Sequence, residues 1–181
     1  RTLANDGGSV LEFSLLNNIL FSGKTKAVNG NFTFKFIVPK DIDYSFGKGK
    51  ISYYASEGTE DMTGKFTDFI AGGFSNSEIT DTNGPEIELY LNDTLFRNGG
   101  MSDKNPTLLA IIRDNGGINT TGSSIGHDLT AYLDDEKNKS FVLNSYFESD
   151  FDNYKRGKIL YQLTDLGDGK HSISLKAWDN Y

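Results

Sequence analysis

The more regular half of the sequence opens with GPEIELYL at residues 84–91 and closes with GKHSISLKAWD at residues 169–179. Apolar and polar residues alternate in both runs, which is the period of a strand with one buried face. Further apolar runs lie between them, separated by the Gly, Asn and Asp residues that favour tight turns. We therefore expect residues 84–181 to form about seven short strands, an all-β immunoglobulin-like sandwich.

The same alternation gives the expected strands of this half of the chain. We expect strands at residues 86–91, 106–113, 127–133, 139–144, 158–163 and 171–177. The run at 106–113 contains five consecutive apolar residues and is predicted to be buried on both faces. Residues 146–157 are aromatic and acidic.

The first half of the chain carries a clear hairpin signal at Asn29-Gly30, because both residues tolerate the positive φ of a type I′ turn. After this turn, Phe32, Phe34 and Phe36 alternate with polar residues, which predicts a strand that ends at Pro39. A strand is also expected at residues 24–28.

The segment before the hairpin, residues 10–21, fits either a strand or a helical turn, and we favour strand. A further strand is expected at residues 51–55, followed by a polar loop over 56–64. Residues 75–84 are polar, rich in turn formers and followed by Pro85, which is typical of a linker. We therefore expect two β-sandwich domains, residues 1–80 and 84–181.

Composition excludes several classes of function. The 181 residues carry a formal net charge of −7 and no basic stripe, which argues against a nucleic-acid partner. The absence of cysteine excludes disulfides and a cysteine nucleophile in this chain. No apolar run approaches the roughly 20 residues of a membrane helix, so no transmembrane segment is expected. The first residue, Arg1, is not an initiator Met, and we expect the chain to be a piece of a longer protein.

Two histidines invite a catalytic interpretation, but a structural one is favoured for both. His127 and Asp128 lie near serines at 123 and 124, yet adjacent residues on a strand point to opposite faces and cannot easily pair. His171 follows a tight turn, and we expect it to fix that turn. No catalytic residue is therefore predicted.

Acidic residues crowd the second half, and loops rich in Asp, Asn and Gly can supply the hard oxygen ligands that Ca²⁺ prefers. The weak candidates for a structural calcium site are Asp114, Asp128, Asp150 and Asp152. The sequence has no EF-hand loop, and DNGG at 114–117 reads equally well as a turn. No other cofactor is expected.

The only tryptophan, Trp178, is the candidate interface residue. Alternation places it with Ser172, Ser174 and Lys176 on the face opposite the core, where it would contact a neighbouring domain. The alternative is that it stacks on a sugar. Other aromatic residues could extend such a platform: Tyr53, Tyr54, Tyr146, Phe147, Phe151 and Tyr154.

Several motifs resemble one known family. NGG at 98–100, DNGGINT at 114–120, IGHDLTA at 125–131 and the closing run at 169–179 resemble the region after the peptidase domain in type IX secretion sortases. These sortases are gingipain-like cysteine peptidases of Bacteroidetes. In the first half, FKFIVPKDI at 34–42, GKGKISYYA at 47–55 and residues 66–74 resemble the same proteins.

The resemblance implies a parent protein at the cell surface, associated with the outer membrane. It would remove C-terminal sorting domains from secreted cargo and link the cargo to an anionic lipopolysaccharide, using a Cys/His pair. This chain has no cysteine, and neither His127 nor His171 matches the family's catalytic histidine. The implied role is a non-catalytic scaffold whose partners are the parent's peptidase domain, outer-membrane secretion components or cargo.

Two other functions stay open at this level. The chain could be a stand-alone carbohydrate-binding or adhesin module, which a row of exposed coplanar aromatic rings would favour. Aromatic rings absorbed into the core, with an apolar patch near Trp178, would favour the scaffold. A hydrolase using two surface carboxylates would need a cleft that holds both.

Overall fold

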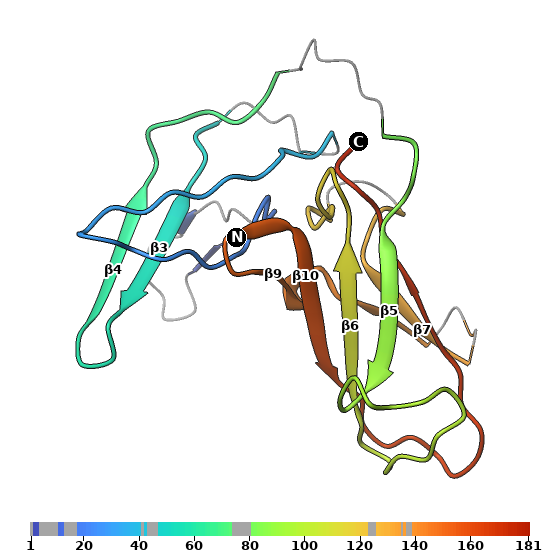
Figure 1. The fold of residues 1–181 in the computed structure, drawn as a ribbon. Helices are drawn as coiled ribbons and strands as arrows, with labels where there is room; N and C mark the ends of the chain where they lie inside the picture. The colour runs from blue at the N-terminus through green and yellow to red at the C-terminus, as the bar shows by residue number, and fades with distance from the viewer. Residues whose placement is uncertain are drawn as a thin grey trace. The chain divides into compact units, whose positions relative to one another are not determined.

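The computed structural model describes residues 18–40, 42, 47–73, 81–122, 126–134, 136 and 139–181, and the backbone of two short strands near the N-terminus. Within these residues the elements are strands and one 3₁₀ turn, η1 (Asn144–Tyr146), which confirms the all-β prediction. The chain divides into two compact units (Figure 1). The first combines Arg1–Asn18 with Tyr44–Phe74, and the second combines Ile19–Asp43 with Ser75–Tyr181.

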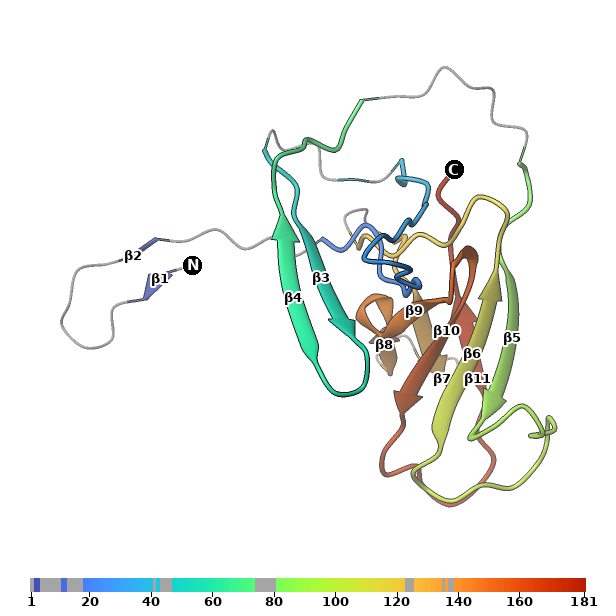
Figure 2. The same cartoon turned by 60° about the vertical axis from the view of Figure 1, so that its left-hand side comes forward.

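The second unit contains a β-sandwich of seven antiparallel strands. One sheet has the order β5-β6-β10-β9, formed by β5 (Glu86–Leu91), β6 (Thr107–Arg113), β10 (Asn153–Gln162) and β9 (Phe147–Asp150). The other has the order β11-β7-β8, formed by β11 (Ile173–Lys176), β7 (Thr130–Leu133) and β8 (Ser140–Val142) (Figure 2). Sheets of four and three strands match the expected immunoglobulin-like architecture.

The core lies between these two sheets. Leu108, Ala110 and Ile112 of β6 are buried against Ile159 of β10 and Ala131 of β7. The alternate residues of β6 are only half-buried, so the prediction that this strand is buried on both faces is wrong. One face of β6 packs in the sandwich, whereas the apolar run had suggested a strand covered on both sides.

Several strand boundaries differ from the expected ones. Strands β7 and β11 begin at Thr130 and Ile173, later than expected. Strand β9 lies in the aromatic and acidic stretch, and β10 begins at Asn153, ahead of the strand expected at 158–163. In β10, Gly157 allows this pairing: a Cβ there would lie 2.4 Å from the Phe147 ring and 2.5 Å from the Glu148 carbonyl oxygen. The register shifts between Asn153 and Gly157, as at a bulge.

The segment Ile19–Asp43 belongs to the second unit. The predicted turn is confirmed: Asn29 and Gly30 have φ of 51° and 76°, and Val28 and Asn31 exchange two backbone hydrogen bonds. Beyond that bridge, the described residues 18–40 form no named strand, so the strands expected at 24–28 and 31–38 are not present. The backbone of the early segment instead bonds to β9 and to the turn after it. Ser149 N–H donates to Ser22 O, and Asp152 N–H donates to Lys24 O.

The first unit contains two small antiparallel sheets. Strand β3 (Ile51–Ser56) was expected, and it pairs with β4 (Asp61–Phe66), which begins inside the predicted polar loop. Every residue of β4 is exposed, which explains why its sequence lacks an apolar face. β1 (Thr2–Leu3) pairs with β2 (Leu11–Glu12), within the segment where strand was favoured, and residues 13–17 lie outside the described residues. That residues 1–80 form a sandwich of their own stays a prediction.

Candidate functional site

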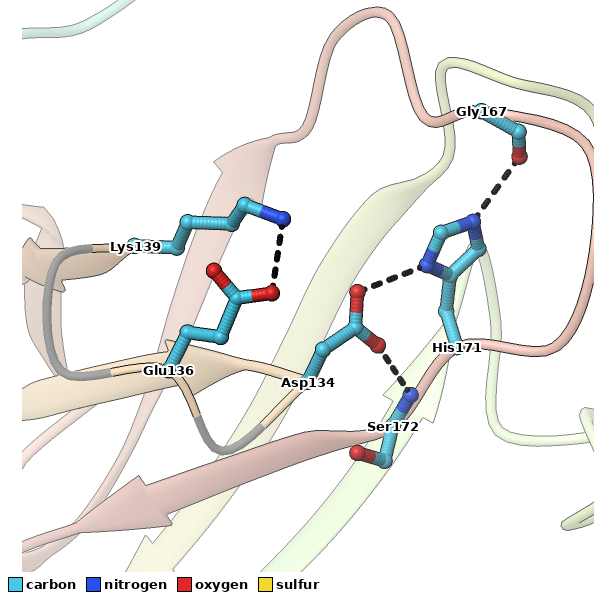
Figure 3. A network of polar contacts seen from close by, with 6 residues as sticks. All are labelled: Asp134, Glu136, Lys139, Gly167, His171 and Ser172. Carbon is cyan, nitrogen blue, oxygen red and sulfur yellow. Dashed lines mark hydrogen bonds and ion pairs between the residues drawn. The ribbon is translucent and has the colours of Figure 1, made fainter.

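A polar network joins the end of β7 to the start of β11 (Figure 3). His171 Nδ1 lies 2.9 Å from Asp134 Oδ2, and His171 Nε2 lies 2.8 Å from the carbonyl oxygen of Gly167. The histidine thus bridges the preceding turn to the neighbouring strand. The prediction that His171 fixes this turn is confirmed.

Asp134 holds the strand junction through its backbone as well as its carboxylate. Its Oδ1 accepts the Ser172 N–H at 2.9 Å, and its own N–H donates to Ser172 O at 2.8 Å. Asp134 has φ of 57°, a left-handed conformation that Asp and Asn tolerate better than most residues. Beside it, Lys139 Nζ pairs with Glu136 Oε1 at 3.0 Å. No local sequence pattern pairs His171 with Asp134, because the two residues are 37 positions apart.

The electrostatics of the pair favour its charged form. The hydrogen bond to Asp134, and then that to Gly167, raise the pKa of His171 above its usual value. The hydrogen bond from His171, and then that from Ser172 N–H, lower the pKa of Asp134. The two side chains are about a quarter exposed, so water screens the ion pair.

Asp134, His171 and Ser172 have the residue types of a catalytic triad but not its geometry. In a triad, one imidazole nitrogen faces the serine hydroxyl while the other faces the carboxylate. Here the second nitrogen of His171 faces the Gly167 carbonyl, and Ser172 joins the network through its backbone N–H. The network therefore ties the strands together through hydrogen bonds.

The candidate interface residue Trp178 lies in a small cluster. The His127 ring centroid is 4.4 Å from that of Trp178, and Lys176 Nζ lies 4.5 Å from the indole centroid. The Trp178 carbonyl accepts the Asn119 N–H at 2.8 Å. The indole is thus partly covered by its own chain, and its role as an interface residue stays a prediction.

The four calcium candidates lie in different settings. Asp114 is half-buried and accepts the Gly116 N–H at 2.6 Å, and burial, more than the nearby Asp179, raises its pKa. Asp128 lies near Gly122, and Asp150 forms an ion pair with Arg156. Within the described part of the chain, no three His, Asp or Glu side chains gather as a metal ion would require. The calcium site therefore stays a prediction.

A groove of about 240 Å³ separates the segment Ile19–Asp43 from the turn between β9 and β10. Phe21, Phe34 and Tyr154 contribute aromatic walls, and Asp150 and Asp152 lie on its acidic side. Both acids are calcium candidates in the sequence, but no local pattern places them beside the phenylalanines. No local sequence pattern could have predicted the groove, because it exists only where the early segment packs on the turn.

The sequence matches no protein-family model and no curated protein sequence. Its fold, however, has a counterpart among solved structures. The chain is similar to PorU of Porphyromonas gingivalis. The matching crystal structure is of dimeric latent PorU, with 30% sequence identity, a TM-score of 0.55 and 99% of this chain covered.

The similarity spans 17% of the PorU chain. It therefore extends through both compact units of this chain while leaving most of PorU without a counterpart here. The match agrees with the family resemblance of the sequence motifs. No helix long and apolar enough to cross a membrane occurs in the described residues.

Proposed function

We infer that this chain is a non-catalytic accessory region of a type IX secretion sortase exposed at the cell surface and associated with the outer membrane. The similarity to PorU over 99% of the chain carries this proposal. The parent would cleave the C-terminal sorting domains of secreted cargo with residues outside this chain. The absence of cysteine agrees with this division, since a cysteine peptidase needs its thiolate.

The principal partner in this scaffold role is the peptidase domain of the parent. Outer-membrane secretion components and cargo are further partners of the proposed assembly. The cluster around Trp178 is the proposed contact, because tryptophan is enriched among the residues that dominate binding energy at interfaces, and Lys176 lies over this ring. The adjacent His127 would extend this contact surface.

Calorimetry with the purified peptidase domain of the parent protein tests this role. We expect saturable binding that Trp178→Ala weakens about tenfold or more, in the range of an interface hot spot. Leu95→Ala is the matched control, because Leu95 is a large apolar residue that is 80% exposed and outside the cluster. Absence of binding by the natural chain would contradict the scaffold role.

The alternative, a stand-alone carbohydrate-binding or adhesin module, is supported by one observation. The rings of Phe21, Phe34 and Phe36 are near-parallel, with Phe21 and Phe34 at 2° and 6.1 Å between centroids, and Phe32 continues the row at 45% exposure. Other aromatic rings, such as Phe147, are in the core. Retention of the chain on a polysaccharide column without binding to the peptidase domain would favour this alternative.

A further inference from the structure

The groove between the segment Ile19–Asp43 and the β9–β10 turn is a candidate binding site for a small ligand. Its volume of about 240 Å³ is large enough for one six-membered sugar ring or one side chain. Both walls belong to the second compact unit, and the Asp152 N–H to Lys24 O bond of 3.0 Å fixes them together. The groove is therefore a feature of one packed unit.

Aromatic rings line the groove from both sides. Phe21 and Phe34 come from the early segment, whereas Tyr154 comes from β10. Phe151 follows β9 in the adjoining turn and is 58% exposed. Exposed aromatic faces bind apolar C–H surfaces in water, because the contact buries apolar area on both partners.

Two of the four charged residues that line the groove are already paired. Lys24 Nζ contacts Glu148 Oε1 at 2.6 Å, and Arg156 contacts Asp150. Lys35 and Asp152 also line the groove, and neither has a charged partner among the described residues. One anionic acceptor and one cationic donor are thus available to a ligand.

The neighbouring Asn153 adds a neutral donor. Its Oδ1 accepts the Lys155 N–H at 3.0 Å, which leaves the amide NH₂ as the group available for a further hydrogen bond. Asp152 and Asn153 therefore present an acceptor and a donor side by side. Two vicinal hydroxyl groups match this arrangement, because one can donate to the carboxylate while the other accepts from the amide.

We propose that this groove binds a pyranose between the rings of Phe34 and Tyr154, with two vicinal hydroxyls on Asp152 and Asn153. Aromatic rings beside hydroxyl-matching polar groups distinguish a sugar from a purely apolar ligand, which would leave Asp152 unsatisfied. The proposal goes beyond the scaffold role and does not rest on it. The Trp178 cluster and the groove use different residues.

The test is an NMR titration of the ¹⁵N-labelled chain with the methyl pyranosides of glucose, galactose and mannose. We expect at least one of them to shift the amide signals of Lys24, Asp152 and Tyr154 saturably. A dissociation constant in the millimolar range is typical for a ligand of this size. Asp152→Asn should weaken the binding about tenfold, because it removes a charged hydrogen-bond acceptor.

Asp165→Asn is the matched control, because Asp152 and Asp165 share φ of 54° and Asp165 is exposed away from the groove. It should bind as the natural chain does, and Asn tolerates this backbone conformation at both sites. Phe34→Leu should also weaken binding while leaving the signals of the β6 core in place. The proposal is overturned if no pyranoside gives saturable shifts at the groove, if only N-acetylphenylalaninamide does, or if Asp152→Asn binds as tightly as the natural chain.

Discussion

At the residue scale, one ion pair joins distant parts of the sandwich. His171 and Asp134 connect the turn at Gly167 to the junction of β7 and β11 through three hydrogen bonds. Each partner shifts the pKa of the other towards the charged state. The stability that the pair contributes must therefore depend on pH.

The direction of this dependence follows from the two shifts. The raised pKa of His171 means that its contribution is complete below the usual value of about 6.5 and is lost as the pH rises through the folded-state pKa. The lowered pKa of Asp134 means that its contribution is complete above about 3.9 and is lost as the pH falls through the folded-state pKa. The pair is thus most stabilising between about pH 4 and pH 6.5.

We predict that His171→Ala lowers the melting temperature more at about pH 5.5 than at about pH 9, where the natural histidine is neutral. Thermal unfolding followed by circular dichroism across this range measures the difference. Asp134→Asn should remove the same pH dependence while keeping an oxygen for the Ser172 N–H and tolerating φ of 57°. An equal effect of His171→Ala at both pH values would show that the pair carries no charge-dependent stability.

At the element scale, the pairing of β9 with β10 depends on one glycine. The position of Gly157 brings the backbone of β10 against the Phe147 ring and the Glu148 carbonyl. Phe147 is buried in the core, and a backbone oxygen cannot move aside as a flexible side chain would. A side chain at 157 therefore has to displace the strand.

We predict that Gly157→Ala destabilises the chain by about 1–3 kcal/mol, the usual cost of overpacking a core. Urea unfolding followed by circular dichroism gives the free energy of unfolding. Gly167→Ala is the matched control, because no atom lies within 4 Å of its added Cβ and its φ is not in the left-handed range. A Gly157→Ala chain as stable as the control would refute the close approach of β9 and β10.

At the scale of the whole molecule, the second unit is assembled from two separate stretches of sequence. Ser22, Lys24 and Lys40 of the early stretch form backbone bonds with Ser149, Asp152 and Asn180. Phe21 and Phe36 line a small cavity with Ile118 and Phe147, two residues of the core. The early stretch therefore covers one side of the sandwich.

We predict that a fragment of residues 81–181 unfolds at a lower urea concentration than the full chain. Loss of the early stretch would expose apolar surface near Phe147 and leave the N–H groups of Ser149 and Asp152 without their backbone partners. Adding the separate peptide of residues 19–43 should partly restore the midpoint by mass action. If the fragment unfolded at the same urea midpoint as the full chain, the result would instead support a domain boundary near residue 80.

Patterns within a few consecutive residues were enough to predict some of the strands and turns. Alternation predicted the strands β5 and β11, and Asn29-Gly30 predicted its turn, because side-chain period and backbone preference act over a few residues. It could not reveal β4, whose residues are all exposed and carry no apolar period. The row of phenylalanines at 32, 34 and 36 has a strand's alternation yet joins no sheet, because pairing requires a partner strand.

Contacts between residues far apart in the chain are seen only in the folded structure. His171 pairs with Asp134 rather than with a nucleophile, and Asp152 lies beside Phe34, 118 positions earlier in the chain. Such pairings depend on the order of strands in each sheet and on the packing of the early segment over the β9–β10 turn. No local pattern encodes that choice, because it follows from the free energy of the whole folded unit.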